Sequence, residues 1–365
     1  MSERVLNFSA GPAVLPVTVL EQAQQAVVEL PGHGMSILEM SHRSEPVEEV
    51  LEEAKTLLSE LLGVPAGYSL LFLQGGASLQ FSMVPANFLR GAGKPADYIV
   101  TGSWANKAAD AARLEGDVHV AFDGKPHNFT YMPQSSELRL SPDAAYVHMT
   151  ANETIQGIEF SSEPEVGDVP LMCDASSDFL SRPIPVEQYG LIYACAQKNA
   201  GIAGVGVVLV RDDLLERVPD GLPPMLDYKL QAENDSRYNT PPVFGIYMLM
   251  LVARWLKHDV GGLAKMADRN RKKAQLLYDL LDEHPDFFRG HARAESRSMM
   301  NVTWRLPSED LEKRFLEEAK TQGLCELKGH RSVGGIRASI YNAMPREGVE
   351  RLREFMIAFH KQHAG

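Results

Sequence analysis

Seven short apolar runs alternate with stretches of helical periodicity between residues 68 and 210, and this alternation limits the possible folds more than any other feature of the chain. Strands that alternate with helices in this way are typical of a mostly parallel sheet with helices on both faces. We therefore predict an α/β fold with a seven-stranded sheet. The predicted strands are 68–73, the start of 96–104, 117–121, 144–149, 169–173, 191–196 and 205–210.

The character of the chain changes after about residue 260. Earlier helices are predicted at 17–30 and 45–62, the second with Ser44 as its N-cap. The later part reads as a helix, strand, helix, strand and helix at 262–284, 298–306, 308–322, 335–340 and 346–363. We predict an N-terminal segment (1–15) packing near the small domain, a large domain (16–260) and a small α+β domain (261–365).

The charge balance excludes several classes of partner. The 365 residues include 36 Lys and Arg against 48 Asp and Glu, a net charge of −12, so we expect neither nucleic acid nor an anionic membrane as a partner. The apolar run 244–256 contains Arg254 and is shorter than the roughly 20 residues of a spanning helix. Three cysteines form no paired framework, and the N-terminus shows no signal pattern, so we expect a cytoplasmic protein.

Lys198 is the only charged residue between Glu187 and Arg211, in the apolar, glycine-rich stretch "YACAQKNAGIAGVGVVLV". A lysine at a strand end is most often an ordinary loop residue. Here the apolar surroundings should remove water from the ammonium group, lower its pKa and favour the neutral, nucleophilic amine. These are the conditions that a lysine needs to form a Schiff base with a carbonyl cofactor.

Asp174 ends another apolar strand, twenty-four residues before Lys198. That interval fits one helical step and a return strand, so both residues can lie at the carboxyl-end edge of neighbouring strands, where α/β sheets bind ligands. An aspartate beneath a pyridine nitrogen keeps that nitrogen protonated and makes the ring an electron sink. The alternative is a turn residue that only ends a strand.

Two further features fit a planar, phosphorylated cofactor. "LQGGASLQF" (73–81) predicts a strand, a glycine turn and a helix start, which places the amides of Gly76, Ala77 and Ser78 where they can hold a phosphate. Trp104 follows a strand and could stack on a ring, although ordinary packing is the alternative. "RGAGKP" (90–95) lacks the glycine and hydroxyl residue of a Walker loop, and no G-x-G-x-x-G motif supports dinucleotide binding.

Cationic residues recur in two similar motifs. "SHRS" contains His42 and Arg43, and "GHRSVGGIRASIYN" contains His330, Arg331 and Arg337. Arginine binds carboxylate and phosphate in a bidentate manner, and an unpaired guanidinium in an apolar strand would be costly. We therefore predict two cationic poles for a substrate with two anionic ends. No H-E-x-x-H motif or Cys/His cluster is present, so we predict no metal.

Taken together, these motifs resemble those of the phosphoserine aminotransferase family, which belongs to the class V aminotransferases and to the fold type I pyridoxal-phosphate enzymes. Some members of that family carry His-Gly-Gly-Gly-Arg where this chain has Gln74-Gly75-Gly76-Ala77-Ser78, so amides and a hydroxyl should replace the arginine here. The matching motifs run in family order: "NFSAGPAVLP" (7–16), "SHRS" (41–44), "LQGGAS" (73–78), "TGSWANKA" (101–108), "NETIQG" (152–157), "DASSDFLSRP" (174–183), "AQKNAG" (196–201), "NTPPVFGIY" (239–247) and "GHRSVGGIRASIYNA" (329–343).

The resemblance implies a reversible ping-pong transamination in serine biosynthesis. It would convert 3-phosphohydroxypyruvate and L-glutamate to O-phospho-L-serine and 2-oxoglutarate, and some relatives also use 4-phosphohydroxy-L-threonine in pyridoxine biosynthesis. The implied cofactor is pyridoxal 5'-phosphate, and the implied catalytic residues are Lys198, which binds the cofactor and shuttles a proton, and Asp174, which pairs with the pyridinium.

The resemblance also implies the remaining roles. The cofactor phosphate would be held by Gly76, Ala77, Ser78 and Gln197, and the ring by Trp104 and Thr154. In a homodimer, Asn239 and Thr240 would reach the phosphate of the partner subunit. Arg337 would take the substrate α-carboxylate, and the distal anion would be bound by His42, Arg43, His330 and Arg331.

Two other readings stay open at this point. One is an aminotransferase or desulfurase of the same fold, although a desulfurase needs a reactive cysteine, and Cys173 and Cys195 fall inside predicted strands while Cys325 has no activating neighbours. The other is a non-catalytic regulator or a nucleotide-binding module. Whether the purified protein is yellow from bound cofactor would separate these readings.

Overall fold

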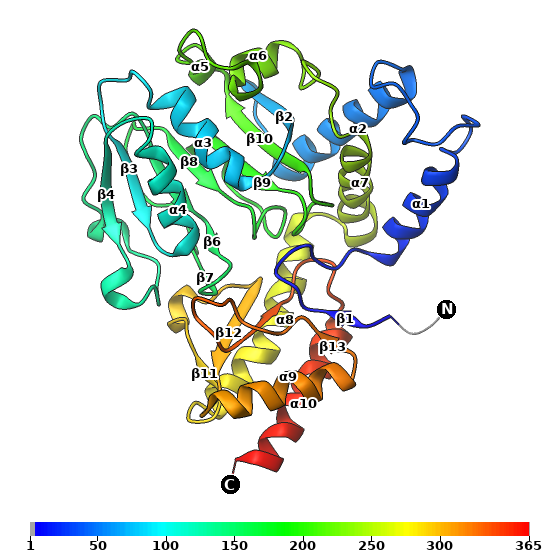
Figure 1. Cartoon of the computed structure of the whole chain (residues 1–365), viewed down its shortest axis with the longest axis vertical. Coiled ribbons are helices and arrows are strands. Elements are labelled where there is room, and N and C mark those ends of the chain that lie inside the picture. The colour runs from blue at the N-terminus through cyan, green and yellow to red at the C-terminus, as the bar shows by residue number, and fades with distance from the viewer. Residues whose placement is uncertain (1–3, 365) are drawn as a thin grey trace.

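The computed structural model describes residues 4–364 (Figure 1). Met1, Ser2, Glu3 and Gly365, which the sequence assigns to the N-terminal segment and to the small domain, lie outside the described residues. A seven-stranded sheet forms the upper part of the molecule in Figure 1, and a smaller unit with the C-terminus lies below it.

The large sheet is mostly parallel, as predicted. Its strand order is β2-β10-β9-β8-β5-β3-β4, and β10 runs antiparallel to both of its neighbours while the other pairs are parallel. The strands are β2 (Tyr68–Gln74), β3 (Ala96–Val100), β4 (Val118–Asp123), β5 (Val147–Thr150), β8 (Leu171–Asp174), β9 (Tyr189–Cys195) and β10 (Val205–Arg211). The predicted α/β class and the seven predicted strands are confirmed, with ends that shift by a few residues.

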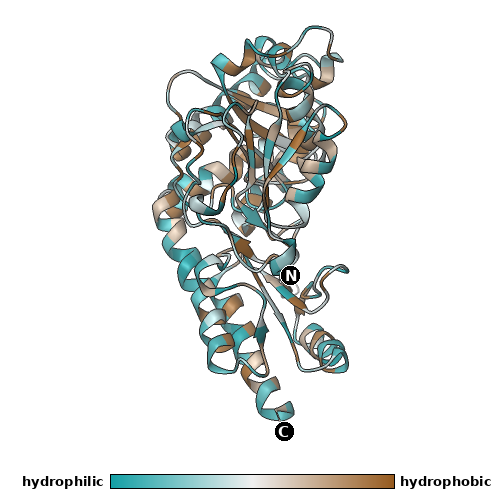
Figure 2. Ribbon diagram, turned by 90° about the vertical axis from the view of Figure 1, so that its left-hand side faces the viewer, coloured by the Kyte–Doolittle hydropathy of each residue, from teal (hydrophilic) through white to brown (hydrophobic). Residues whose placement is uncertain are grey.

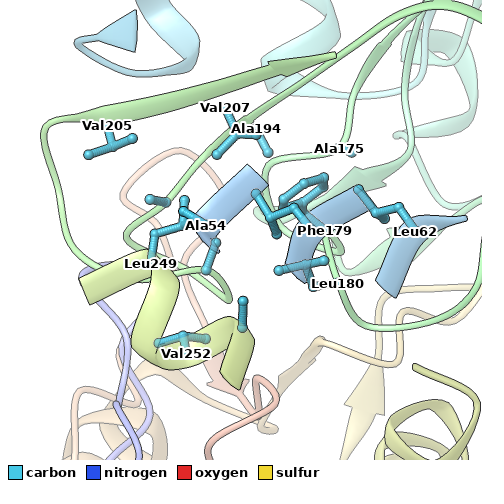
Figure 3. Packing of buried hydrophobic residues seen from close by; sticks show 14 of the residues in the cluster. Ala54, Leu62, Ala175, Phe179, Leu180, Ala194, Val205, Val207, Leu249 and Val252 are labelled. Atoms are coloured by element: carbon cyan, nitrogen blue, oxygen red, sulfur yellow. The ribbon is translucent and has the colours of Figure 1, made fainter. Parts of the chain in front are cut away.

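Helices cover both faces of this sheet because successive strand residues point to opposite sides. Phe72 packs with one helix layer, whereas its neighbours Leu71 and Leu73 pack with the other. Figure 3 shows the first layer, where Ala194 and Val207 of the strands lie near side chains of α2 and α7. That layer contains α1 (Val17–Val28), α2 (Glu45–Leu62) and α7 (Val243–Arg254), and the second contains α3 (Ala77–Phe88), α4 (Ser103–Ala112), α5 (Asp212–Leu215) and α6 (Tyr228–Glu233).

The helix α2 shows how local sequence sets an element. Ser44 precedes it in an extended conformation, and apolar residues at helical spacing form its buried face. It ends at Gly63, whose φ of 65° is left-handed, a conformation that glycine adopts without strain.

The later part of the chain builds its own sheet and helices. Strands β11 (Arg289–Gly290), β12 (Asn301–Arg305) and β14 (Ile336–Ser339) form an antiparallel sheet that packs with α8 (Leu263–Glu283), α9 (Glu309–Thr321) and α10 (Arg346–His363). In Figure 2 these lower helices are largely hydrophilic, while brown, hydrophobic segments concentrate in the strands above. We propose the division 16–260 and 261–365 as two domains, and separate apolar clusters support it.

The N-terminal segment joins the lower unit. Strand β1 (Leu6–Asn7) pairs in parallel with β13 (Leu324–Cys325), and Phe8 is fully buried in the same apolar cluster as α9 and α10. These contacts support the proposed role of residues 1–15 as a segment that packs near the small domain.

Some local features were not expected from the sequence. The helix α7, which contains most of the apolar run 244–256, continues as a π-helix, Trp255–Val260. A small hairpin of β6 (Asn152–Glu153) and β7 (Ile158–Glu159) follows β5. Within residues 4–364, no helix is both long and apolar enough to cross a membrane.

A buried histidine in the centre of the sheet makes folding sensitive to pH. His148 on β5 is 1% exposed, stacks on Tyr98 and lies 2.9 Å from the hydroxyl of Tyr193 through Nε2. Burial lowers the pKa of His148 to about 3. Below its usual pKa near 6.5, the unfolded chain therefore takes up a proton that the folded chain excludes, and stability falls as the pH falls.

We expect the burial of His148 to lower the free energy of unfolding by about 2 kcal/mol when the pH falls from 7 to 5. His148→Gln keeps a polar group beside Tyr193 but removes the titration, so its free energy of unfolding should depend less on pH. Urea unfolding of both proteins at the two pH values measures the difference, and parallel pH profiles would contradict the assignment.

Candidate active site

A cavity of about 360 Å³ lies at the carboxyl ends of the parallel strands, and most of the predicted site residues line it. The wall on the side of the lower unit comes from the segment around β14 and from the N-terminal segment. A larger cavity of about 740 Å³ between the N-terminal segment and α8 contains none of these residues. The predicted residues in the first cavity are Gly76, Ala77, Ser78, Trp104, Thr154, Asp174, Gln197, Lys198, His330 and Arg337.

Lys198 lies just beyond the end of β9, and its ammonium group is surrounded by protein although the cavity leaves part of the side chain accessible. Its Nζ donates a hydrogen bond of 2.8 Å to the hydroxyl of Thr154 and lies 5.8 Å from the centre of the Trp104 ring. The end of strand β9 thus places the amine in the cavity, and Thr154 of the β6–β7 hairpin binds it there.

The electrostatics of Lys198 differ from the expectation. Burial alone lowers its pKa, but the electrostatic effects of Tyr341, Cys195, Asp174 and Glu153 outweigh burial, and the pKa is raised. The expectation of a lowered pKa is therefore wrong for the protein without a bound cofactor. The sequence analysis expected Asp174 near the amine, but it did not anticipate the contributions of Tyr341 and Glu153, which come from other segments of the chain.

Asp174 ends β8, the parallel neighbour of β9. It is 3% exposed, and its Oδ1 accepts a hydrogen bond of 2.9 Å from the backbone amide of Ser176. Burial raises its pKa, while the bonds from Ser176 and the charge of Lys198 act in the opposite direction. A buried carboxylate with few donors is suited to pair with a cationic ring nitrogen.

The start of α3 forms one end of the cavity. Gly76 is its N-cap, and the helix itself cannot satisfy the amides of Ala77 and Ser78 in the first turn. Gln197, next to Lys198, lines the same cavity. Free amides at the positive end of a twelve-residue helix are a suitable binding place for a phosphate group.

Buried polar atoms without a partner also occur on side chains that line this cavity. Among the described residues, four cavity-lining side chains have a buried polar atom without a hydrogen-bond partner: Trp104 Nε1, Thr150 Oγ1, Asn152 Oδ1 and Gln197 Oε1. Such atoms are rare in folded proteins. Their convergence here, with an amine, a carboxylate and free helix amides, fits a polar, phosphorylated, carbonyl-bearing cofactor.

Arg337 on β14 forms part of the opposite wall. Its guanidinium is largely buried, and burial lowers its pKa, while Tyr341 raises it. Within residues 4–364 no hydrogen bond or ion pair to another protein group satisfies its side chain. A buried, unpaired guanidinium is costly, so an anionic ligand is the partner that this position lacks.

The remaining predicted residues do not line the cavity of their own chain. Asn239 and Thr240 are exposed beside Gln74, whose Nε2 donates a hydrogen bond of 2.6 Å to the carbonyl of Thr240. Their loop is tied to the first turn of α2 by an ion pair of 2.8 Å between Arg237 and Glu48. The other outlying residues are His42 and Arg43, just before α2, and Arg331, which is exposed in the turn after His330.

The cavity also contains residues that the sequence analysis did not single out. Ala10 and Gly11 reach it from the N-terminal segment, and Ser176, Ser177 and Thr150 reach it from strand ends. Thr150 and Ser176 could have been found, because they lie at or just beyond the carboxyl ends of predicted strands. Ala10 and Gly11 lie in the motif "NFSAGPAVLP", but strand ends do not point to them, since only the fold brings the N-terminal segment to the cavity.

Comparison with known proteins agrees with this geometry. Residues 5–352 match the family model described as aminotransferase class-V. The chain therefore belongs to the class V aminotransferase family, as the sequence motifs predicted.

Several relatives that are about half identical to this chain are named phosphoserine aminotransferase. The protein of that name from Rhodopirellula baltica is 54% identical over 363 residues, which cover 99% of this chain and 96% of that one. The phosphoserine aminotransferase structure from Bacillus circulans subsp. alkalophilus has a TM-score of 0.96 at 52% identity and covers 99% of both chains. A PLP-bound phosphoserine aminotransferase from Trichomonas vaginalis has a TM-score of 0.91 at 42% identity, covering 97% of this chain and 100% of that one.

The hairpin that holds Lys198 offers a matched test of site geometry. Gly157 closes this hairpin with φ of 72°, and a Cβ there would lie 2.6 Å from the carbonyl oxygen of Asn301. Gly167 has a similar φ of 65°, but a Cβ would meet nothing within 4 Å.

Gly167→Ala should therefore cost only the left-handed backbone strain of about 1 kcal/mol. Gly157→Ala should cost roughly 3 kcal/mol in free energy of unfolding, because overlap with fixed backbone adds to the same strain. Chemical denaturation of the two variants measures both values, and equal losses would show that the hairpin does not pack against β12 as described.

Proposed function

We propose that this chain is a phosphoserine aminotransferase that converts 3-phosphohydroxypyruvate and L-glutamate to O-phospho-L-serine and 2-oxoglutarate, reversibly and in two half-reactions. The observation that carries the proposal is the placement of Lys198 and Asp174 at the ends of neighbouring parallel strands, in one cavity with the unpaired guanidinium of Arg337. The ordered motifs and the full-length relatives support the same reaction.

In this proposal the cavity holds pyridoxal 5'-phosphate, which when bound supplies an electron sink for charge that develops at the substrate α-carbon. Asp174 pairs with the ring nitrogen, Trp104 packs on the ring, and Thr154 lies beside the ring hydroxyl. The phosphate group binds at the start of α3 through Gly76, Ala77 and Ser78, and Gln197 contributes its amide.

Lys198 has two tasks in the reaction. It anchors the cofactor covalently in the resting enzyme, and once substrate has displaced it, it moves the proton at the substrate α-carbon, first as a base and then as an acid. The raised pKa of Lys198 means that the amine must lose a proton before it can act as a nucleophile. The hydrogen bond to Thr154 keeps the amine within reach of the cavity.

The cations bind the two ends of the substrate. Arg337 takes the α-carboxylate, since it lines the cavity and lacks a protein partner among the described residues. His330 also lines the cavity, and burial, with Arg337, Lys107 and Arg331 acting in the same direction, lowers its pKa. His330 and Arg331 bind the distal phosphate or γ-carboxylate.

The proposal includes a homodimer with shared sites. Asn239, Thr240, His42 and Arg43 do not line their own cavity, and the Arg237–Glu48 ion pair places their two segments near each other. Exposed apolar side chains, Met35, Leu38 and Tyr238, lie in the same segments. A second copy would cover this surface and receive these four residues at its own cofactor phosphate and distal anion pole.

Two finer points belong to the same proposal. The enzyme acts in the cytoplasm, which agrees with three cysteines that form no disulfide. It also accepts 4-phosphohydroxy-L-threonine, which shares a carboxylate and a distal phosphate with phosphoserine. A desulfurase would need a reactive thiol, whereas burial raises the pKa of Cys173 well above its usual value and makes that thiol inert.

Steady-state kinetics test the distal anion pole. Arg331→Ala should raise the Michaelis constants for phosphoserine and glutamate by at least about tenfold, because a charge-assisted hydrogen bond is lost. Alanine, which has no distal anion, should be used poorly by both proteins. Arg314→Ala removes an exposed arginine on α9 and serves as the control of equal charge; equal kinetics for the two variants would refute the role of Arg331.

Mixed dimers test the shared site. Lys198→Ala and a His42→Ala/Arg43→Ala double variant should each be nearly inactive alone. When they are unfolded and refolded together, activity should return to about a quarter of the wild-type value, since half of the dimers are mixed and each mixed dimer keeps one intact site. No recovery, despite mixed dimers on a native gel, would place His42 and Arg43 in the site of their own chain.

A further inference from the structure

Glu153 is a buried carboxylate to which the proposed reaction gives no role. It is 0% exposed, on the short strand β6 next to Thr154, and it adjoins the cavity without appearing among the predicted site residues. An ionisable group this deeply buried is rare unless it has specific partners. The partners of Glu153 explain its presence.

The two oxygens of Glu153 bind the start of α4. Oε2 accepts a hydrogen bond of 3.1 Å from the backbone amide of Trp104, and Oε1 accepts one of 2.8 Å from the amide of Ala105. These are the second and third residues of α4, the amides that an N-cap side chain normally satisfies. The N-cap itself is Gly102, which has no side chain, so Glu153 caps this helix from a different segment of the chain.

The N-cap position must be glycine because there is no room for a side chain beside Glu153. Its φ of −174° is extended, and any residue could adopt that conformation. A Cβ at position 102, however, would lie 2.4 Å from Cδ of Glu153. An ordinary N-cap residue and the Glu153 carboxylate therefore exclude each other, and this chain uses the carboxylate.

The cap connects the Trp104 ring to the lysine. Thr154, the residue after Glu153, is bonded to Nζ of Lys198, and Gln156 donates a hydrogen bond of 2.9 Å to the hydroxyl of Ser103 at the start of α4. One hairpin thus holds both Lys198 and the first turn of α4. The Trp104 side chain leaves the backbone at the residue whose amide Glu153 binds.

We propose that Glu153 is a positioning residue that fixes the Trp104 ring against the cofactor by capping α4 from the β6–β7 hairpin. This inference rests on the proposed function, in which Trp104 packs on the pyridoxal ring. Glu153 has no hydrogen bond to Lys198 among the described residues, and its main effect passes through the backbone of Trp104, beside a smaller electrostatic effect on Lys198.

The charges around Glu153 agree with this role. Burial raises its pKa to about 7, the amides of Ala105 and Trp104 lower it, Asp174 raises it and Lys198 lowers it. Only the ionised carboxylate presents two acceptor oxygens to the amides of Trp104 and Ala105, and the positive end of α4 also favours that form. A neutral glutamine can replace one of the two acceptors but not both.

Titration of the cofactor-free protein with pyridoxal 5'-phosphate measures how Glu153 affects the dissociation constant of the cofactor. The circular dichroism of the bound cofactor and the thermal midpoint of the cofactor-free protein are measured on the same variants. Glu153→Ala should raise the dissociation constant roughly tenfold and weaken the dichroism, because losing a helix cap costs about the equivalent of one decade in affinity. Glu153→Gln should fall between wild type and Glu153→Ala. Glu165→Ala removes a carboxylate from an exposed loop position and should leave the dissociation constant unchanged.

The decisive variant moves the helix cap from Glu153 to a serine at position 102. Gly102→Ser alone should weaken cofactor binding, because its Cβ displaces the Glu153 carboxylate. Combined with Glu153→Ala, the same serine has room and can accept from the amides of Trp104 and Ala105. The double variant should therefore bind cofactor more tightly than either single variant. If the losses of binding free energy in the two single variants add up in the double variant, the capping role is overturned.

A second comparison tests the path through Trp104. In a Trp104→Leu background, Glu153→Ala should change the dissociation constant less than twofold, since the ring that Glu153 positions is gone. An undiminished tenfold effect in that background would overturn the inference and indicate that the carboxylate acts on the cofactor directly. If the wild-type protein itself fails to bind pyridoxal 5'-phosphate, it is the proposed function that fails, and the two failures are thereby distinguished.

Discussion

The site depends on the burial of one ammonium group among carboxylates. Burial alone would lower the pKa of Lys198, but the electrostatic effects of Tyr341, Cys195, Asp174 and Glu153 together outweigh burial and raise it. The same carboxylates are themselves buried, so each needs the lysine or a set of amides as a partner. The lysine and the two carboxylates therefore hold one another in place at the cavity. The unpaired polar atoms of the side chains around them still lack hydrogen-bond partners within residues 4–364.

The fold provides this arrangement through the sheet. Parallel strands β8 and β9 end at the same edge and bring Asp174 and Lys198 together, while the hairpin β6–β7 adds Glu153 and Thr154. The lower unit then supplies Arg337 from β14, and the N-terminal segment reaches the cavity because β1 pairs with β13. The binding cavity therefore lies where three separate parts of the chain meet.

Much of this could be predicted from the sequence, and the exceptions have physical reasons. The seven strands, the class V family and the approach of Asp174 to Lys198 followed from apolar periodicity, motif order and the spacing between strand ends. The pKa of Lys198 was predicted in the wrong direction partly because two of the groups that raise it, Tyr341 and Glu153, come from other segments. Glu153 lies inside the motif "NETIQG" but received no role there, since its capping contact depends on the missing side chain of Gly102. His42 and Arg43 do not line the cavity of their own chain.

The most direct test of the account is the chemical identity of the residue that holds the cofactor. The purified protein should be yellow. Borohydride reduction should remove the yellow absorbance and attach the pyridoxyl group permanently to Lys198. Peptide mapping by mass spectrometry identifies the labelled residue. Lys107, whose Nζ lies 4.3 Å from the centre of the Trp104 ring, is the natural internal comparison. Label on Lys107, or a colourless protein that cannot be reconstituted with pyridoxal 5'-phosphate, would contradict the account.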